Sequence, residues 1–352
     1  MPLVETEKLT HTYSPGTPFE RVAIRDIDFT AEKGEYLGII GATGSGKSTF
    51  IQHLNGLLKP TSGRVRFDGR DIHESRSYTR EIRFKVGLVF QYPEYQLFEA
   101  TVFGDIAFGP RNMGLPESDV RERVLEAAGF AGLDDPLLEK SPFELSGGEK
   151  RRAAIAGVIA MRPEVLILDE PTAGLDPRGR DEIIRNIMNY KRARDATVIM
   201  VTHNMEEIAR TVDRIVLFEN GGAVMDGTPA RVFSDSDRLR ELGLTAPKVS
   251  LIAARLRAMG LPLPQDIYTT GQMRSALAEL HPELHPELHP ELHPELHSEL
   301  HSELHSELHS ELHPELHPEL HSELHPESEI RNPEFADDGR ETENVRSGDE
   351  YA

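Results

Sequence analysis

One stretch of the chain has the residue types and the spacing of a phosphate-binding loop (P-loop), G-x-x-x-x-G-K-[ST]. Its residues are Gly41, Ala42, Thr43, Gly44, Ser45, Gly46, Lys47 and Ser48. The three glycines let backbone N–H groups converge on an anion without interference from Cβ atoms. The lysine would reach the β- and γ-phosphates of a nucleoside triphosphate, and the final serine would ligate Mg²⁺. The pattern therefore predicts a nucleotide site, with Thr49 near the α-phosphate.

The segments on either side of this loop distinguish it from a chance match. Residues 36–40 form a short apolar run that predicts a buried strand, and residues 49–54 predict a helix. A helix that begins after the loop would present free N–H groups and the positive end of its dipole to the same anion. The alternative is an accidental glycine-rich turn.

Two carboxylates follow a second apolar run, Val165–Leu168. A buried strand of an α/β sheet would deliver Asp169 and Glu170 to the crevice that contains the P-loop. Asp169 suits Mg²⁺, which prefers oxygen ligands. Glu170 points differently and could polarise an attacking water. A structural carboxylate pair is the alternative.

Two further buried-strand candidates end in polar residues. Gln91 follows residues 86–90, and His203 follows residues 196–201 after one threonine. Residues at the carboxyl ends of strands face the ligand crevice of an open α/β sheet, so both are candidate catalytic residues. Gln91 is also a candidate Mg²⁺ ligand. Taken singly, such a glutamine is usually structural, and such a histidine is usually packed or on the surface.

A second anion-binding nest could form where another helix is predicted to start. Ser146, Gly147 and Gly148 open this helix and precede Glu149. Their backbone N–H groups could bind a phosphate. A serine followed three residues later by glutamate is also an ordinary helix cap, and both interpretations can hold together.

Two residues are candidates for contact with the nucleotide at other points. Tyr13 lies roughly 30 residues before the P-loop, and it could stack on the base or be a packed or surface aromatic. Asp176 lies in a loop before a helix that is predicted over residues 179–194.

The rest of the pattern indicates one α/β domain over residues 1–240 with additions. Residues 3–30 predict short strands, and residues 92–160 contain a predominantly helical insertion. Residues 241–280 predict a small helical extension, in which residues 247–259 form one amphipathic helix. Its candidate apolar positions are Leu251, Ile252, Ala254, Leu256 and Met259.

Composition limits the classes of function. The 352 residues include no cysteine, which excludes disulfides, thiolate metal sites and a Cys nucleophile. The net charge is −21, but residues 281–352 contain 20 Asp/Glu and 3 Arg, whereas the other 280 residues contain 40 acidic and 36 basic groups. No basic face concentrates in that balanced part, so we expect no nucleic-acid partner. We also expect no membrane helix and no signal peptide.

A four-residue unit, His-Pro-Glu-Leu or His-Ser-Glu-Leu, occurs twelve times in slightly degenerate form from His281 to His325. Proline at every fourth position forbids helix in the flanking parts, whereas residues 295–313 lack proline and could align five histidines on one helix face. We expect a disordered acidic tail over residues 281–352. The alternative is weak binding of Zn²⁺, Ni²⁺ or Co²⁺ by neutral imidazoles.

The order of these motifs is more specific than any one of them. Along the chain it runs Lys47, Gln91, Leu145–Glu149, Asp169–Glu170 and His203. This series resembles the ATP-binding-cassette (ABC) ATPases over about residues 3–240. The resemblance implies an α/β fold with a RecA-like P-loop NTPase core, an antiparallel β subdomain and an inserted helical subdomain. It also implies ATP and Mg²⁺ as cofactors.

Two further segments narrow the resemblance to energy-coupling factor (ECF) transporter ATPases, and most closely to the second of their two paralogous ATP-binding subunits. They are residues 90–98, Phe-Gln-Tyr-Pro-Glu-Tyr-Gln-Leu-Phe, and residues 105–110. In that family two ATPase subunits pair and bind a shared transmembrane coupling protein. They power uptake of vitamins or Ni²⁺/Co²⁺ through membrane-embedded substrate-binding proteins. The resemblance thus implies a peripheral subunit at the cytoplasmic face of the cell membrane.

The family also implies a division of labour between two cassettes that close head-to-tail on two ATP molecules. Glu170 would polarise the attacking water, while His203 would hold the γ-phosphate and the water in line. The segment Ser146–Gly148 would complete the partner's site. Residues 92–98 would lead to a surface on which Glu94 and Glu99 grip basic helices of the coupling protein; the alternative is a subdomain hinge with no partner.

Other functions are weighed against this one. A soluble ABC protein that acts on DNA or ribosomes would need a coiled-coil insertion, a second cassette or a basic face, and the sequence has none of them. An importer ATPase for amino acids or phosphate is disfavoured by residues 92–98. The ATPase of a dedicated nickel or cobalt importer, and a metal-storage protein that functions through its tail, are the remaining alternatives.

Overall fold

The computed structural model describes residues 1–280, so the His/Glu repeat, the acidic tail and the metal-binding alternative raised for them lie outside the described residues. The described part contains a six-stranded sheet with the order β10–β9–β3–β8–β7–β6. Its strands are β3 (Tyr36–Ile40), β6 (Val86–Val89), β7 (Val165–Asp169), β8 (Thr197–Val201), β9 (Arg214–Glu219) and β10 (Gly222–Gly227). Neighbouring strands are parallel except β9 and β10, which form an antiparallel hairpin.

The central strands of this sheet are apolar because both of its faces are covered. Every residue of β3, β6, β7 and β8 is buried. Continuous apolar runs are typical of parallel strands in this position, and the four buried strands predicted from the sequence are confirmed. The helices that connect the strands are α1 (Lys47–Leu54), α2 (Arg76–Lys85), α7 (Pro177–Arg194) and α8 (Met205–Thr211).

A second, antiparallel sheet has the order β2–β1–β4–β5. Its strands are β1 (Val4–Tyr13), β2 (Arg21–Ala31), β4 (Ser62–Phe67) and β5 (Arg70–Asp71). Phe50 of α1 packs against Phe29 of β2 and Phe218 of β9, with ring centroids 5.1 and 5.0 Å apart. The core between the two sheets therefore holds the helix that follows the P-loop.

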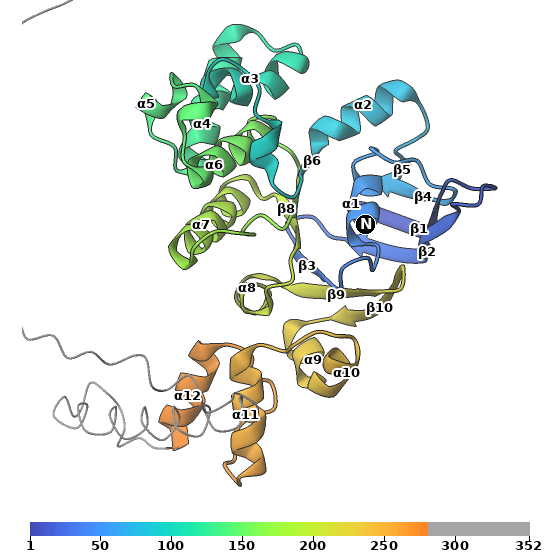
Figure 1. Ribbon diagram of the computed structural model, residues 1–352, viewed down its shortest axis with the longest axis vertical. Coiled ribbons are helices and arrows are strands. Elements are labelled where there is room, and N and C mark those ends of the chain that lie inside the picture. Colours follow the sequence, from blue (N-terminus) through green and yellow to red (C-terminus); the bar gives the residue numbers. More distant parts are fainter. Residues whose placement is uncertain (281–352) are drawn as a thin grey trace, which may run out of the picture. The chain divides into compact units, whose positions relative to one another are not determined.

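The chain between β6 and β7 forms a group of helices (Figure 1). Its buried apolar side chains belong to the same core cluster as residues of β3, β7 and α7. Its elements are η1 (Pro93–Gln96), α3 (Val102–Asn112), α4 (Glu117–Ala131), α5 (Asp135–Leu138), η2 (Pro142–Glu144) and α6 (Gly147–Ile159). Buried alanines on the facing sides of α4 and α6, among them Ala128 and Ala156, keep the volume between these helices small.

Four more helices follow the six-stranded sheet, and in one of them the buried residues differ from the predicted ones. They are α9 (Pro229–Ser234), α10 (Ser236–Glu241), α11 (Lys248–Ala258) and α12 (Thr270–Leu280). Helix α11 is confirmed, but its buried residues are Val249, Ser250 and Ala253, whereas Leu251 and Ile252 are exposed. The reason is that α12 packs on the side of α11 with the smaller residues. Within residues 1–280 no helix is both long enough and apolar enough to cross a bilayer.

The guanidinium group of Arg151, on α6, joins three segments and is only 3% exposed. Its Nε and Nη2 donate to the two carboxylate oxygens of Glu94, at 3.1 and 2.7 Å. Its Nη1 donates to the carbonyl oxygens of Pro171 and Ala173. This planar fork of donors therefore connects the segment after β6 to helix α6 and to the loop after β7.

The environment of the Glu94 side chain also differs from the one expected from the sequence. Its side chain is 16% exposed, and both of its oxygens accept hydrogen bonds from Arg151. The expectation that Glu94 extends from the surface to grip a basic helix is therefore wrong. Its partner lies 57 residues further along the chain, which the local pattern could not indicate.

Replacing Arg151 with Met should lower the free energy of unfolding by about 3–5 kcal/mol, because the Glu94 carboxylate would stay largely buried without its cation. Urea denaturation followed by circular dichroism measures this change. Arg240→Met is the control, since Arg240 and Asp237 form an ion pair whose side chains are 77% and 84% exposed; it should cost less than about 1 kcal/mol. Equal free energies of unfolding for the two variants would show that the buried Arg151–Glu94 pair does not stabilise the fold.

Candidate functional site

The P-loop joins β3 to α1, and all three of its glycines have positive φ angles, that of Gly44 being 81°. Gly41 and Gly46 have φ angles of 148° and 103°, in the region that favours glycine. A Cβ atom on Gly41 would lie 2.3 Å from the carbonyl oxygen of Phe218, and one on Gly46 would lie 2.7 Å from that of Ala23. Neighbouring backbone on two sides therefore fixes the path of the loop.

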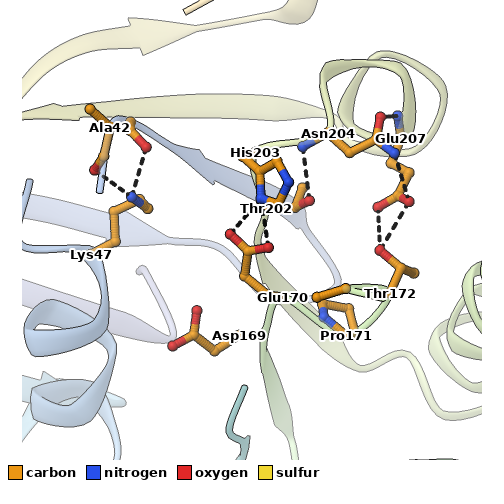
Figure 2. Close-up of polar contacts among 12 residues, drawn as sticks. Ala42, Lys47, Asp169, Glu170, Pro171, Thr172, Thr202, His203, Asn204 and Glu207 are labelled. Carbon is orange, nitrogen blue, oxygen red and sulfur yellow. Dashed lines mark hydrogen bonds and ion pairs between the residues drawn. The ribbon is translucent and has the colours of Figure 1, made fainter. Parts of the chain in front are cut away.

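The start of α1 fits a phosphate group. Gly46 is the N-cap of this helix and provides no side-chain hydrogen bond, so the first-turn N–H groups can donate to an anion. Lys47 Nζ donates to the carbonyl oxygens of Gly41 and Ala42, at 2.7 and 2.8 Å (Figure 2). Burial lowers the pKa of Lys47, although the nearby carboxylates oppose this shift.

A hydrogen bond joins Ser48, at the start of α1, to Asp169, at the end of β7. The Ser48 hydroxyl donates to Asp169 Oδ2 at 3.0 Å, and burial raises the pKa of the Asp169 carboxyl group. A hydroxyl and a carboxylate are hard oxygen ligands that fit Mg²⁺, which commonly takes one or two carboxylates together with substrate phosphates. Within residues 1–280 no group of three or more His, Asp or Glu side chains is placed to hold a metal, so Mg²⁺ here would need phosphate oxygens as well.

Glu170 and His203 form a close pair beside this position. Nδ1 of His203 lies 2.8 Å from Oε1 and 2.7 Å from Oε2 of Glu170 (Figure 2). A carboxylate oxygen accepts, so Nδ1 of His203 is the donor in this pair. The His203 side chain is 73% exposed. Glu170 has a φ angle of 53°, and its N–H donates to the Val201 carbonyl at 2.8 Å, so the chain turns sharply as it leaves the sheet.

An open pocket of about 220 Å³ lies beside the P-loop. Its lining includes Tyr13 and Arg21 from the antiparallel sheet and Lys47, Ser48 and Thr49 from α1. The Tyr13 hydroxyl is 3.2 Å from the Thr49 hydroxyl. The register of β1 and β2 pairs Tyr13 with Arg21, so an aromatic ring and a cation flank the same pocket.

His11 packs against Tyr13, and His53 packs against His11. The His11 ring lies 4.6 Å from the Tyr13 ring and 4.7 Å from the His53 ring, in both cases edge to face. Nδ1 of His53 is 2.7 Å from the Thr49 carbonyl oxygen. Burial, together with the neighbouring histidines, lowers the pKa of His53 to about 4. His53 is therefore neutral at physiological pH, because its pKa lies well below 7.

The other predicted residues lie apart from this constellation. Gln91 is exposed after β6, and within the described residues no hydrogen bond joins its side chain to Ser48 or Asp169. Ser146 caps α6 in a reciprocal capping box with Glu149. Asp176 caps α7, where its carboxylate accepts from the Gly179 N–H at 2.8 Å. The structure thus describes their local roles, and their roles toward a nucleotide stay predictions.

Sequence reasoning missed three residues of this region: Arg21, Thr172 and Glu207. Arg21 could have been found from its place opposite Tyr13 had the strand register been known. Glu207 follows His203 by four residues, which is one helical turn, but the sequence does not show which of two adjacent glutamates turns inward.

Comparison with known proteins agrees with this geometry. A family model described as "ABC transporter" matches residues 24–173. The energy-coupling factor transporter ATP-binding protein EcfA2 of Caldanaerobacter subterraneus subsp. tengcongensis is 52% identical over 266 residues, which cover 76% of this chain and 93% of the relative. EcfA2 of Clostridium perfringens is 50% identical over 278 residues, which cover 79% and 98%.

Two solved structures are similar in sequence and fold. One is cbiO1 from Clostridium perfringens, described as part of the ABC transporter complex cbiONQ, with 39% identity, a TM-score of 0.62 and coverage of 73% of this chain and 98% of that one. The other is the ATP-binding cassette MJ0796, a dimer bound to ADP and Pi, with 27% identity, a TM-score of 0.58 and coverage of 64% and 98%.

The variant Glu170→Gln should bind ATP with nearly unchanged affinity but release phosphate about 10²- to 10⁴-fold more slowly, because an amide cannot accept a proton from water. Nucleotide binding by fluorescence and steady-state phosphate release measure the two effects. Glu164→Gln is the matched control, since this carboxylate precedes the other end of β7. Phosphate release by Glu170→Gln at the rate of the control would contradict the assignment of the base.

The depressed pKa of His53 predicts a pH-dependent stability. The unfolded chain binds a proton at His53 near pH 6.5, whereas the folded chain binds it only near pH 4. Stability is therefore fully present above pH 6.5 and falls as the pH drops toward 4, by about 3 kcal/mol from this group. Urea denaturation at pH 4.5 and 7.5 measures it. His53→Gln, which cannot titrate, should lose that part of the difference; an identical pH dependence in both proteins would refute the shift.

Proposed function

Because the chain belongs to the energy-coupling factor family of ABC transporter ATP-binding proteins, we propose that it hydrolyses ATP at its P-loop to energise the uptake of a solute by a membrane complex. Its activity is that of an ATPase. The observation that carries the proposal is the meeting of three separate segments: Lys47 and Ser48 from α1, Asp169–Glu170 at the end of β7, and His203 after β8.

Each group has a distinct task in this reaction. Lys47 would exchange its two carbonyl acceptors for phosphate oxygens, since an ammonium group binds an anion more strongly than a neutral carbonyl. Mg²⁺ held by Ser48 and Asp169, with Gln91 as a further ligand, would neutralise phosphate charge. Glu170 would accept a proton from the attacking water. His203, fixed through its Nδ1, would present Nε2 toward the γ-phosphate and the water.

The base would occupy the pocket beside Tyr13. That ring supplies an aromatic face for stacking, and Thr49 and Arg21 border the same space. Lys47 is the other cation among the residues that line this pocket, and a triphosphate carries several negative charges. Arg21 therefore adds a second positive charge to balance them. We assign Arg21 to the nucleotide, as a donor to its phosphate or ribose oxygens.

A second ATPase chain would complete the site. Helix α6 begins at Gly147 after its N-cap Ser146, and the N–H groups of Ser146, Gly147 and Gly148 would face the partner chain. In the proposal these groups bind the γ-phosphate held by a second copy or a paralogue, and Asp176 lies at the same interface. The solved dimer of MJ0796 with ADP and Pi supports such pairing.

The membrane partner would bind an aromatic surface made of Tyr92, Tyr95, Phe98 and Phe108. These side chains are 44%, 85%, 60% and 47% exposed, and the Phe98 and Phe108 rings pack edge to face at 5.0 Å. Buried Asp105 holds this surface in shape, because its Oδ1 accepts from the N–H groups of Phe98 and Glu99. Exposed aromatic clusters of this kind are typical of binding sites.

The partner that fits this surface is an amphipathic helix of a transmembrane coupling protein, which would hold the chain at the cytoplasmic face of the membrane. Substrate-binding membrane proteins would join indirectly and take a vitamin or a transition-metal ion. A dedicated nickel or cobalt importer is a second candidate, because residues 281–325 contain a repeat with twelve histidines and cbiO1 is 39% identical.

The double variant Tyr95→Asp/Phe98→Asp should lose association with the membrane complex while it keeps ATP binding, because charged groups would replace the exposed rings. Co-purification of the tagged chain from membranes, followed by mass spectrometry of its companions, measures association. Leu125→Asp, at a 40% exposed leucine of α4, is the matched control. Recovery of the same companions with all three proteins would argue for a hinge segment without a partner.

A further inference from the structure

A buried carboxylate lies behind the Glu170–His203 pair and belongs to neither the P-loop nor the magnesium position. Glu207, in the first turn of α8, is 2% exposed, and Thr172, two residues after Glu170, is 4% exposed. The Thr172 hydroxyl is 2.9 Å from both carboxylate oxygens of Glu207 (Figure 2). A carboxylate this deeply buried persists only when its oxygens have donors.

A second donor to this carboxylate comes from the loop that carries His203. Asn204 Nδ2 donates to Glu207 Oε1 at 3.0 Å. Asn204 Oδ1 in turn accepts from the N–H groups of Glu206 and Glu207, which caps α8. The carboxylate therefore joins the residue after His203 to the loop after Glu170, and burial raises its pKa.

Two bridges thus connect the same two loops, and they differ in their surroundings. The outer bridge, between Glu170 and His203, has an imidazole that is 73% exposed and has little packing to hold it. The inner bridge, between Thr172 and Glu207, is buried. The loop after Glu170 is also held from its other side, because Arg151 donates to the carbonyls that flank Thr172. The inner bridge therefore sets how far apart the loops stand.

We propose that Glu207 is a positioning residue for ATP hydrolysis: its hydrogen bond with Thr172 fixes the loops of Glu170 and His203 at the separation that their pairing requires. This rests on the proposed function, in which Glu170 is the base. The bland alternative is that Glu207 only stabilises the start of α8. The two interpretations predict different effects of removing the Thr172 hydroxyl. That hydroxyl plays no part in the cap of α8, so only the positioning role predicts a lower kcat when it is lost.

The test compares three variants by steady-state ATP hydrolysis, ATP binding and urea denaturation. Thr172→Val removes the hydroxyl, and Thr172→Ser keeps it. Thr211→Val is the matched control, since the Thr211 hydroxyl donates to the Glu207 backbone carbonyl at 2.7 Å without joining the two loops. We expect kcat to fall about 10- to 100-fold in Thr172→Val with KM within about twofold, because small misplacements of catalytic groups have effects of this size.

Thr172→Ser should recover kcat to within about threefold of the wild type, and Thr211→Val should stay within about twofold. If Thr172→Val does not fold, Thr172→Val/Glu207→Leu replaces both partners with apolar groups, which is often nearly neutral for folding, and it should show the same loss of kcat. Wild-type kcat in a folded variant without the bridge would overturn the proposal, as would a loss that Thr172→Ser does not restore. Failure of Glu170→Gln to slow turnover would instead refute the base itself, so the two claims fail separately.

Discussion

The site depends on the parallel pairing of β3, β8 and β7, which are neighbours in the six-stranded sheet. Val201 of β8 lies opposite Ile39 of β3 on one side and Asp169 of β7 on the other. Parallel strands end at the same edge, so the P-loop, the loop after Asp169 and the loop after Val201 must emerge side by side. This pairing brings Ser48 within hydrogen-bond distance of a carboxylate 121 residues away.

Buried polar groups also tie the loops beyond this edge to neighbouring elements. Arg151 joins the loop after β7 to η1 and α6, and Glu207 joins it to α8. Hydrogen bonds to charged groups are strong and directional when they are buried. A shift of η1, which adjoins the aromatic surface, would therefore reach the loop after β7 through Arg151.

The sequence predicted the sheet and the strand-end residues because apolar runs such as Val165–Leu168 have a single plausible environment, the interior of a parallel sheet. It could not predict Glu94, because a local run of aromatic residues suggested a surface while the partner of the carboxylate lay far along the chain. The buried face of α11 was misjudged for a related reason. Periodicity finds an amphipathic helix, but the packing of α12 decides that Val249 and Ala253 are buried and Ile252 is not.

The central claim is that a nucleoside triphosphate binds where these three loops meet. A crystal structure with Mg²⁺ and a non-hydrolysable ATP analogue tests it most directly. The account predicts that Lys47 leaves the carbonyl oxygens of Gly41 and Ala42 for phosphate oxygens, and that Mg²⁺ lies against Ser48 and Asp169. A triphosphate bound elsewhere, or Lys47 still hydrogen-bonded to both carbonyls, would contradict it.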